Sequence, residues 1–236
     1  MFQEEIDIDF IYSKNEILLR WLKHFPKSKR IKVKNILSID SDNSNLDKKV
    51  IEYFPNCDKY YITQSDYNNY QNCINNLYGN FKFKISYSDI FDYELDPYIS
   101  YDLVIFFTNF NLDESVNSFI KRAFEFVNSN GQIMIVTCRN DKFVKEAREF
   151  FNVNFISDIE FKDKLDINCK LFNTHVSTYL NLNKLTKKEI LRLTNHECTD
   201  QKLEEFKKIA INKYGDIICV PISIIILSKY KFLHKN

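Results

Sequence analysis

Apolar runs typical of buried β-strands alternate with segments at helical spacing through the first half of the chain and beyond. Strands are expected at residues 36–39, 59–64, 81–90, 101–110 and 132–138. Helices are expected at residues 10–25, 47–54, 65–78, 113–128 and 141–151, with Asn130-Gly131 terminating the fourth. Strict alternation of this kind predicts a parallel sheet with helices on both faces.

The order of elements changes after the fifth expected strand. A strand-like run covers 170–182, two helical segments follow at 186–194 and 199–213, and an apolar run covers 216–230. We therefore expect an antiparallel strand pair with helices inserted between its arms. The 236 residues fit one α/β domain. Its parts are a helix and linker over 1–34, a core over 35–152 and the strand pair with its helices over 153–236.

Charge and hydropathy exclude several classes of protein. The formal net charge of +1 gives no global field that would draw the chain onto nucleic acid or an anionic membrane. The basic run from His24 to Lys34 is interpreted as a solvated linker. The apolar run Ile217–Leu227 is too short to span a bilayer and contains Pro221. We expect a cytoplasmic protein with neither a nucleic-acid nor a membrane partner.

Residue types that bind metals or act as nucleophiles form no recognisable pattern. The six cysteines include no Cys-x-x-Cys pair, and no His/Cys spacing is typical of zinc. The four histidines have no recognisable catalytic partners. The sequence therefore predicts reduced thiols and no metal, and it identifies no certain catalytic residue.

The stretch ILSIDSDNSNLD, residues 36–47, stands where α/β proteins often carry a nucleotide-binding loop, and it contains no glycine. The whole chain has only three glycines, against about 7% in average proteins. A calcium loop would also use alternating oxygen ligands, but it needs glycine and glutamate where Asn45 and Ile51 stand. A calcium-binding loop is therefore excluded for this stretch.

The order and spacing of the elements resemble the Rossmann-like class I fold of S-adenosylmethionine-dependent methyltransferases, with a mostly parallel seven-stranded sheet. More closely, the chain resembles the histamine N-methyltransferase group over nearly its whole length. The stretches that carry the resemblance are FIYSKNE (10–16), ILSIDSDNSNLD (36–47), YYITQSD (60–66), YDLVIFFTNFNLDES (101–115) and GDIICVPISIII (215–226).

The resemblance implies a site for S-adenosylmethionine at the ends of the first strands. The family's first loop is glycine-rich because the backbone approaches the cofactor closely. The positions matching the family's cofactor site hold Asp40, Ser41, Asp42, Ser44, Asp47, Gln64, Asp89, Ile90 and Thr108. The carboxylates of Asp40 and Asp42 would take up space that the cofactor needs. Gln64 replaces an acid that accepts both ribose hydroxyls, so we expect weakened cofactor binding.

On the substrate side, the resemblance implies that the carboxylate of Glu16 faces a small-molecule amine. The alternative for Glu16 is an exposed polar position on an amphipathic helix. Thr108 and Val220 stand where the family usually has Gln and Asn. These departures call a histamine-like substrate into question.

Three functions stay open. The first is a non-catalytic methyltransferase-like protein that serves as a binding module or as the partner subunit of another protein. The second is a divergent amine N-methyltransferase that works mainly by positioning. The third is a haloacid-dehalogenase-like phosphatase, in which Asp40 would attack phosphorus, Asp42 would act as acid and base, and Thr108 would supply the second motif. This third family needs a further acid pair, and the sequence offers only Asp141.

Overall fold

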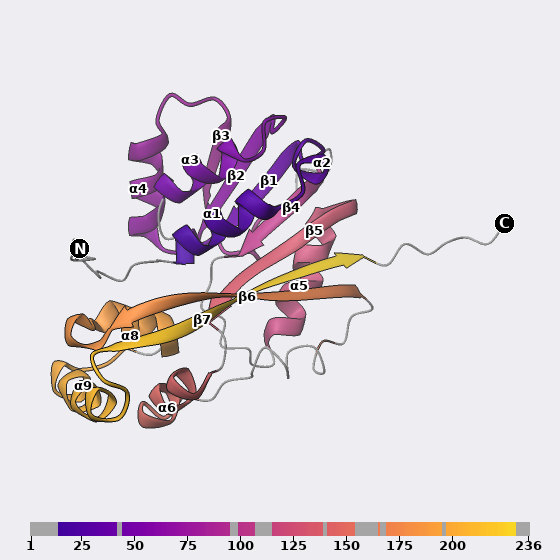
Figure 1. The fold of residues 1–236 in the computed structure, drawn as a ribbon. Helices are drawn as coiled ribbons and strands as arrows, with labels where there is room; N and C mark the ends of the chain where they lie inside the picture. The colour runs from indigo at the N-terminus through magenta and orange to yellow at the C-terminus, as the bar shows by residue number, and fades with distance from the viewer. Residues whose placement is uncertain are drawn as a thin grey trace, which may run out of the picture.

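The computed structural model describes residues 14–41, 44–94, 99–106, 115–138, 141–153, 165, 169–194 and 197–229. These residues form one seven-stranded sheet of order β3-β2-β1-β4-β5-β7-β6 (Figure 1). Five strands are parallel: β1 (Asn35–Ile39), β2 (Lys59–Gln64), β3 (Phe83–Tyr87), β4 (Tyr101–Phe106) and β5 (Val127–Cys138). The strand β7 (Ile217–Lys229) runs antiparallel between β5 and β6 (Cys169–Asn181). The predicted α/β class and the antiparallel pair are confirmed.

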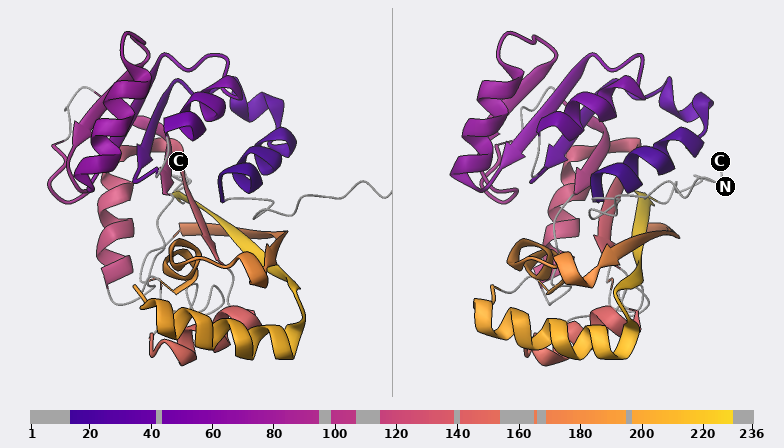
Figure 2. Two further views of the ribbon diagram at one scale, coloured as in Figure 1. Left: turned by 90° about the vertical axis from the view of Figure 1, so that its left-hand side faces the viewer. Right: turned by 60° about the vertical axis from the view of Figure 1, so that its left-hand side comes forward.

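Helices cover both faces of the parallel part of the sheet, on opposite sides in the left view of Figure 2. The helices α1 (Lys14–His24), α3 (Ser44–Glu52) and α4 (Tyr67–Leu77) bury their apolar side chains on one face. The helix α5 (Ser115–Phe126) covers the other. Side chains of β1 alternate between the two layers: Ile36 joins the first, while Leu37 and Ile39 join the second.

The helices predicted between the two antiparallel strands are present. A 3-10 turn η1 (Leu182–Lys184) and the helices α8 (Lys187–Thr194) and α9 (Asp200–Tyr214) connect β6 to β7. Together with α6 (Lys142–Phe150) they gather where β6 ends and β7 begins (Figure 1). Phe143 of α6 packs against Phe206 of α9, with ring centroids 5.8 Å apart. Among the described residues, none of the helices is long and apolar enough to cross a membrane.

One local prediction is wrong. The helix expected to end at Asn130-Gly131 ends at Phe126, and β5 begins at Val127, so both residues lie inside a strand. The cause is tertiary pairing: Val127 pairs with Tyr101 ahead of a register shift, so the strand starts earlier than local turn signals indicate. The basic run interpreted as a linker contains the short helix α2 (Lys27–Arg30).

Candidate functional site

The chain segments that follow β1, β2 and β3 meet at the carboxyl edge of the sheet, where open α/β folds bind ligands. The structure brings together seven of the predicted site residues here, namely Asp40, Ser41, Ser44, Asp47, Gln64, Asp89 and Ile90. Asp42 and Thr108 lie outside the described residues, as does the side chain of Glu16, whose backbone belongs to α1.

Asp40 directly follows β1 and has a φ of 50°, in the left-handed region that favours glycine. Aspartate is one of the few other residues that adopt this region readily, because its short polar side chain can form local hydrogen bonds. The Asp40 amide donates to the carbonyl oxygen of Thr63 at 3.0 Å. The first loop therefore keeps at this position a backbone conformation typical of glycine.

The Asp40 carboxylate links the first loop to the segment after β2. Its Oδ1 accepts hydrogen bonds from the Ser65 amide and the Ser65 hydroxyl, both at 2.8 Å. Bonds of this kind, with a charged acceptor, are stronger than neutral ones. The carboxylate thus spans the gap between the ends of β1 and β2.

Gln64, at the end of β2, is fully buried and points beneath the first loop. Its Nε2 donates to the Ser41 carbonyl oxygen at 2.7 Å and lies 3.2 Å from the Ser41 hydroxyl. The Oε1 atom is buried and has no hydrogen-bond partner among the described residues. The Gln64 side-chain amide therefore stabilises the first loop from inside the protein and is not exposed at the edge of the sheet.

Asp47 lies in the first turn of α3 and is fully buried. Its carboxylate accepts hydrogen bonds from the hydroxyls of Ser38 (2.8 Å), Ser41 (2.5 Å) and Tyr60 (2.8 Å). Burial raises the pKa of Asp47 to about 6, although the three hydrogen bonds oppose the rise. The pKa of Tyr60 is raised well above its ordinary value, by burial first and by Asp47 next. We refer to Ser38, Ser41, Asp47, Tyr60 and Gln64 as the polar cluster.

Ser44 is also held inside the protein. Its hydroxyl accepts a hydrogen bond from the Asn76 side-chain amide of α4 at 2.9 Å, and the residue is buried. This contact ties the start of α3 to α4. Of the residues that replace the family's glycines, Ser41 and Ser44 are therefore buried and hydrogen-bonded inside the protein.

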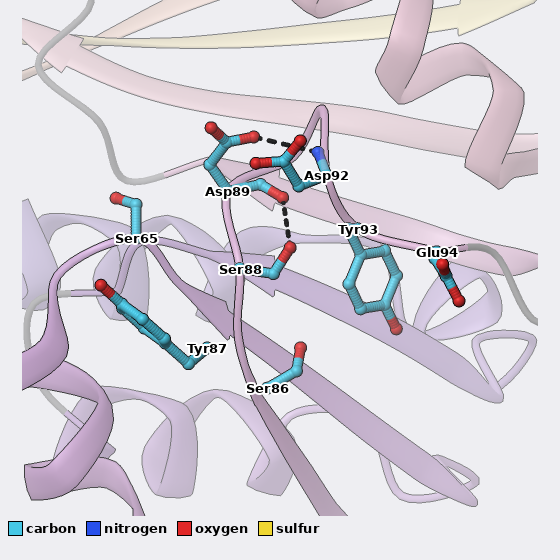
Figure 3. Close-up of a pocket in the computed structure, with 8 residues that line it drawn as sticks. All are labelled: Ser65, Ser86, Tyr87, Ser88, Asp89, Asp92, Tyr93 and Glu94. Carbon is cyan, nitrogen blue, oxygen red and sulfur yellow. Dashed lines mark hydrogen bonds between the residues drawn. The ribbon is translucent and has the colours of Figure 1, made fainter.

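The segment after β3 borders a cavity of about 610 Å³. Its described lining consists of Ser65, Ser86, Tyr87, Ser88, Asp89, Asp92, Tyr93 and Glu94 (Figure 3). Asp89 shapes the turn: its Oδ1 accepts from the amides of Phe91 (2.6 Å) and Asp92 (3.2 Å). Ile90 is buried in the core. Neither Asp40 nor Gln64 is among the described residues that line this cavity. The cavity therefore lies beside the first loop.

No protein-family model matches the sequence, and no curated protein matches it. Solved structures do match, among them a presumed methyltransferase from Bacillus halodurans C-125, with a TM-score of 0.60 and 11% identity over 89% of this chain and 96% of the other. The N-methyltransferase NodS from Bradyrhizobium japonicum WM9 matches with a TM-score of 0.56 and 9% identity over 92% of this chain and 97% of the other. The plantazolicin methyltransferase BpumL, in complex with SAH, matches with a TM-score of 0.56 and 14% identity over 92% and 85%.

The fold is that of a class I methyltransferase. At these identities the similarity establishes the fold alone. The strand order, with β7 antiparallel between β5 and β6, is consistent with it. In this methyltransferase fold the Gln64 side chain is buried, and the Asp40 carboxylate bonds to Ser65 at the edge of the sheet where open α/β folds bind ligands.

Sequence reasoning missed Ser38 and Tyr60 of the polar cluster and, apart from Asp89, the described residues that line the cavity. Ser65, which donates two hydrogen bonds to the Asp40 carboxylate, directly follows β2, so its position after a parallel strand was an available signal. Asp92 and Glu94 line the cavity from an irregular segment. No motif or periodicity marks them.

The described residues contain no group of three or more His, Cys, Asp or Glu side chains that could hold a metal ion. The phosphatase alternative gains no support from the methyltransferases found by comparison. Its proposed nucleophile, Asp40, is also engaged by both donors of Ser65.

Proposed function

We propose that this chain is a methyltransferase-fold protein, related to the histamine N-methyltransferase group, that has lost catalysis and serves as a binding or partner subunit. The observation that carries the proposal is the bond of Asp40 to Ser65 between the ends of β1 and β2, where the resemblance implies a cofactor site. The resemblance of the stretches at 10–16, 36–47 and 60–66 supports the link to that group.

Two features of the edge oppose S-adenosylmethionine in its usual mode. The Asp40 carboxylate would stand next to the carboxylate of the cofactor's methionine part, and like charges repel. The Gln64 Nε2 donates into the protein, and the Gln64 Oε1 acceptor is buried, so neither atom is presented to the ribose hydroxyls. Losing a hydrogen bond to a charged group costs about 1.5–3 kcal/mol, which is at least about tenfold in affinity.

A divergent amine N-methyltransferase is the second candidate, and one observation favours it. Asp40 keeps a positive φ, so the loop backbone retains a conformation that the family reaches with glycine. The cavity beside β3 adds space for part of a ligand. In this candidate Glu16 would attract the amine, and catalysis would rest on placing it against the methyl donor.

Restoring the family residues tests the proposal. The variant carries Asp40→Gly, Asp42→Gly, Ser44→Gly and Gln64→Glu, and calorimetry measures its affinity for S-adenosylhomocysteine. Removing the Asp40 bridge and supplying a ribose acceptor should tighten binding by at least about tenfold over wild type. The matched control carries Asp58→Gly and Gln201→Glu, which are exposed positions away from this edge.

Circular dichroism establishes that each variant is folded before it is titrated. If only the restored variant binds S-adenosylhomocysteine more tightly than wild type, the result supports the proposal that the four replaced side chains close the cofactor site. An equal affinity in the restored variant, the control and wild type would show that these side chains do not close the pocket. Micromolar binding by wild type would instead favour the second candidate.

A further inference from the structure

A second cavity, of about 600 Å³, lies at the amino edge of the sheet, opposite the site described above. Figure 1 shows α2, the start of β5 and the yellow end of β7 at this end of the molecule, away from α9. The described lining consists of Phe25, Lys29, Lys32, Val33, Asp102, Asn128, Ser129, Asn130, Gly131, Gln132, Lys170, Ser228 and Lys229. We call it the amino-edge cavity.

Lysines dominate its charge. Four of the described lining residues are lysines, and Asp102 is the single acid among them. Lys29 and Lys32 come from α2 and the turn after it, whereas Lys170 and Lys229 come from the antiparallel pair. Positive charge therefore faces the same cavity from two walls that are far apart in the sequence. The basic run interpreted as a linker supplies one of these walls.

Asp102, the one acid in the described lining, accepts hydrogen bonds from uncharged amide groups. The Asp102 carboxylate accepts hydrogen bonds from the amides of Lys34 (2.7 Å) and Asn35 (3.0 Å) and from the Asn128 side chain (2.5 Å). These bonds hold the starts of β1, β4 and β5 together. Asp102 therefore holds backbone and side-chain amides at the cavity wall, and its single negative charge offsets only part of the charge of the four lysines.

Two lysines are positioned by their own contacts. Lys229 donates from Nζ to the Val127 carbonyl oxygen at 2.6 Å, which fixes its ammonium group at the start of β5. The Lys29 ammonium lies 5.9 Å from the centroid of the Phe25 ring, which lines the cavity. Asn128, Asn130 and Gln132 add amide groups to the same wall.

We propose that the amino-edge cavity binds a small molecule that carries two or more phosphate groups, such as a nucleoside triphosphate or an inorganic polyphosphate. Lysine binds phosphate oxygens as a point charge, and a concave wall of one sign concentrates its field on an anion. The cavity has the volume of a small-molecule site, and lysines line it from both of its walls. These features favour a compact ligand over a nucleic-acid backbone. The inference does not rest on the proposed function.

Calorimetric titration with ATP and, separately, with inorganic tripolyphosphate tests the proposal. We expect saturable binding with one site per chain. The variant Lys32→Gln with Lys170→Gln removes one charge from each wall and should weaken binding by at least about tenfold. The matched control, Lys202→Gln with Lys208→Gln, removes two exposed charges from α9 and should change affinity less than about twofold.

The two probes separate the sources of phosphate. Binding of both probes identifies the phosphates as the recognised part, whereas binding of ATP alone shows that the nucleoside is also contacted. As a measurement that needs no variant, either bound probe should raise the midpoint of thermal unfolding of wild type. Absence of saturable binding, or equal loss of affinity in the control variant, would overturn the proposal. So would binding of a single-stranded RNA oligonucleotide by a chain that binds neither probe.

Discussion

The Asp47 carboxyl group shows how a loop without glycine is held in place. Three hydroxyls donate to it, from β1, the first loop and β2, and Ser41 also stands within reach of Gln64. The group is fully buried, so these donors replace the water it has lost. The polar cluster therefore fixes the first loop through side chains, where the family uses backbone close to a cofactor.

Replacing Asp47 with alanine should destabilise the protein by roughly 3 kcal/mol, because three buried hydroxyls lose their acceptor. Unfolding in urea at pH 7, followed by circular dichroism, measures the change. The control is Glu52→Ala, on the exposed face of the same helix, which should stay within about 0.5 kcal/mol of wild type. Equal effects of the two substitutions would argue against a structural role for the polar cluster.

The raised pKa of Asp47 should make stability depend on pH. Between the ordinary pKa of 3.8 and the folded-state pKa of about 6, the folded protein holds a proton that the unfolded chain has released. Stability from this group is therefore fully present below pH 4 and is lost as pH rises through 6. Relative to Asp47→Asn, which does not titrate, wild type should lose about 2 kcal/mol of unfolding free energy between pH 4.5 and pH 7.

Urea unfolding of wild type and Asp47→Asn at the two pH values gives this difference directly. Other titrating groups contribute equally to both proteins and cancel. A constant difference across the pH range would mean that Asp47 has the same pKa in the folded and unfolded states.

The junction between α5 and β5 is the element whose sequence was most misleading. Local turn chemistry at Asn130-Gly131 predicts the end of a helix, yet β5 already begins at Val127. Gly131 is needed there for close packing: a Cβ atom would lie 2.6 Å from Val127 Cγ1 and 2.7 Å from the Tyr101 carbonyl oxygen. The glycine marks a close approach of two strands, and a single sequence does not distinguish that from a helix end.

Gly131→Ala should therefore destabilise the protein by about 2 kcal/mol, since the backbone of Tyr101 cannot move aside without disturbing β4. Denaturant unfolding measures the loss. Asn130→Ala, at the exposed neighbouring position, should change stability by less than about 0.5 kcal/mol. If the two alanine variants matched, the tight contact inferred around Gly131 would be wrong.

At the scale of the whole molecule, the alternation of strands and helices was sufficient to predict the sheet and its antiparallel pair. Periodicity indicates which face of an element is buried, and the rules for connections leave few possible topologies. The directions of the site side chains were not predictable in this way. That Gln64 braces Ser41 and that Asp40 reaches Ser65 depends on tertiary contacts between segments about 25 residues apart.

We propose that this methyltransferase fold has closed its usual cofactor position with its own polar side chains. Isothermal titration of the folded wild-type chain with S-adenosylmethionine and S-adenosylhomocysteine tests this most directly. The Asp40 bridge to Ser65 and the burial of Gln64 predict no binding heat at millimolar ligand. Saturable binding of either compound in the micromolar range would contradict the claim and make an active N-methyltransferase the better interpretation.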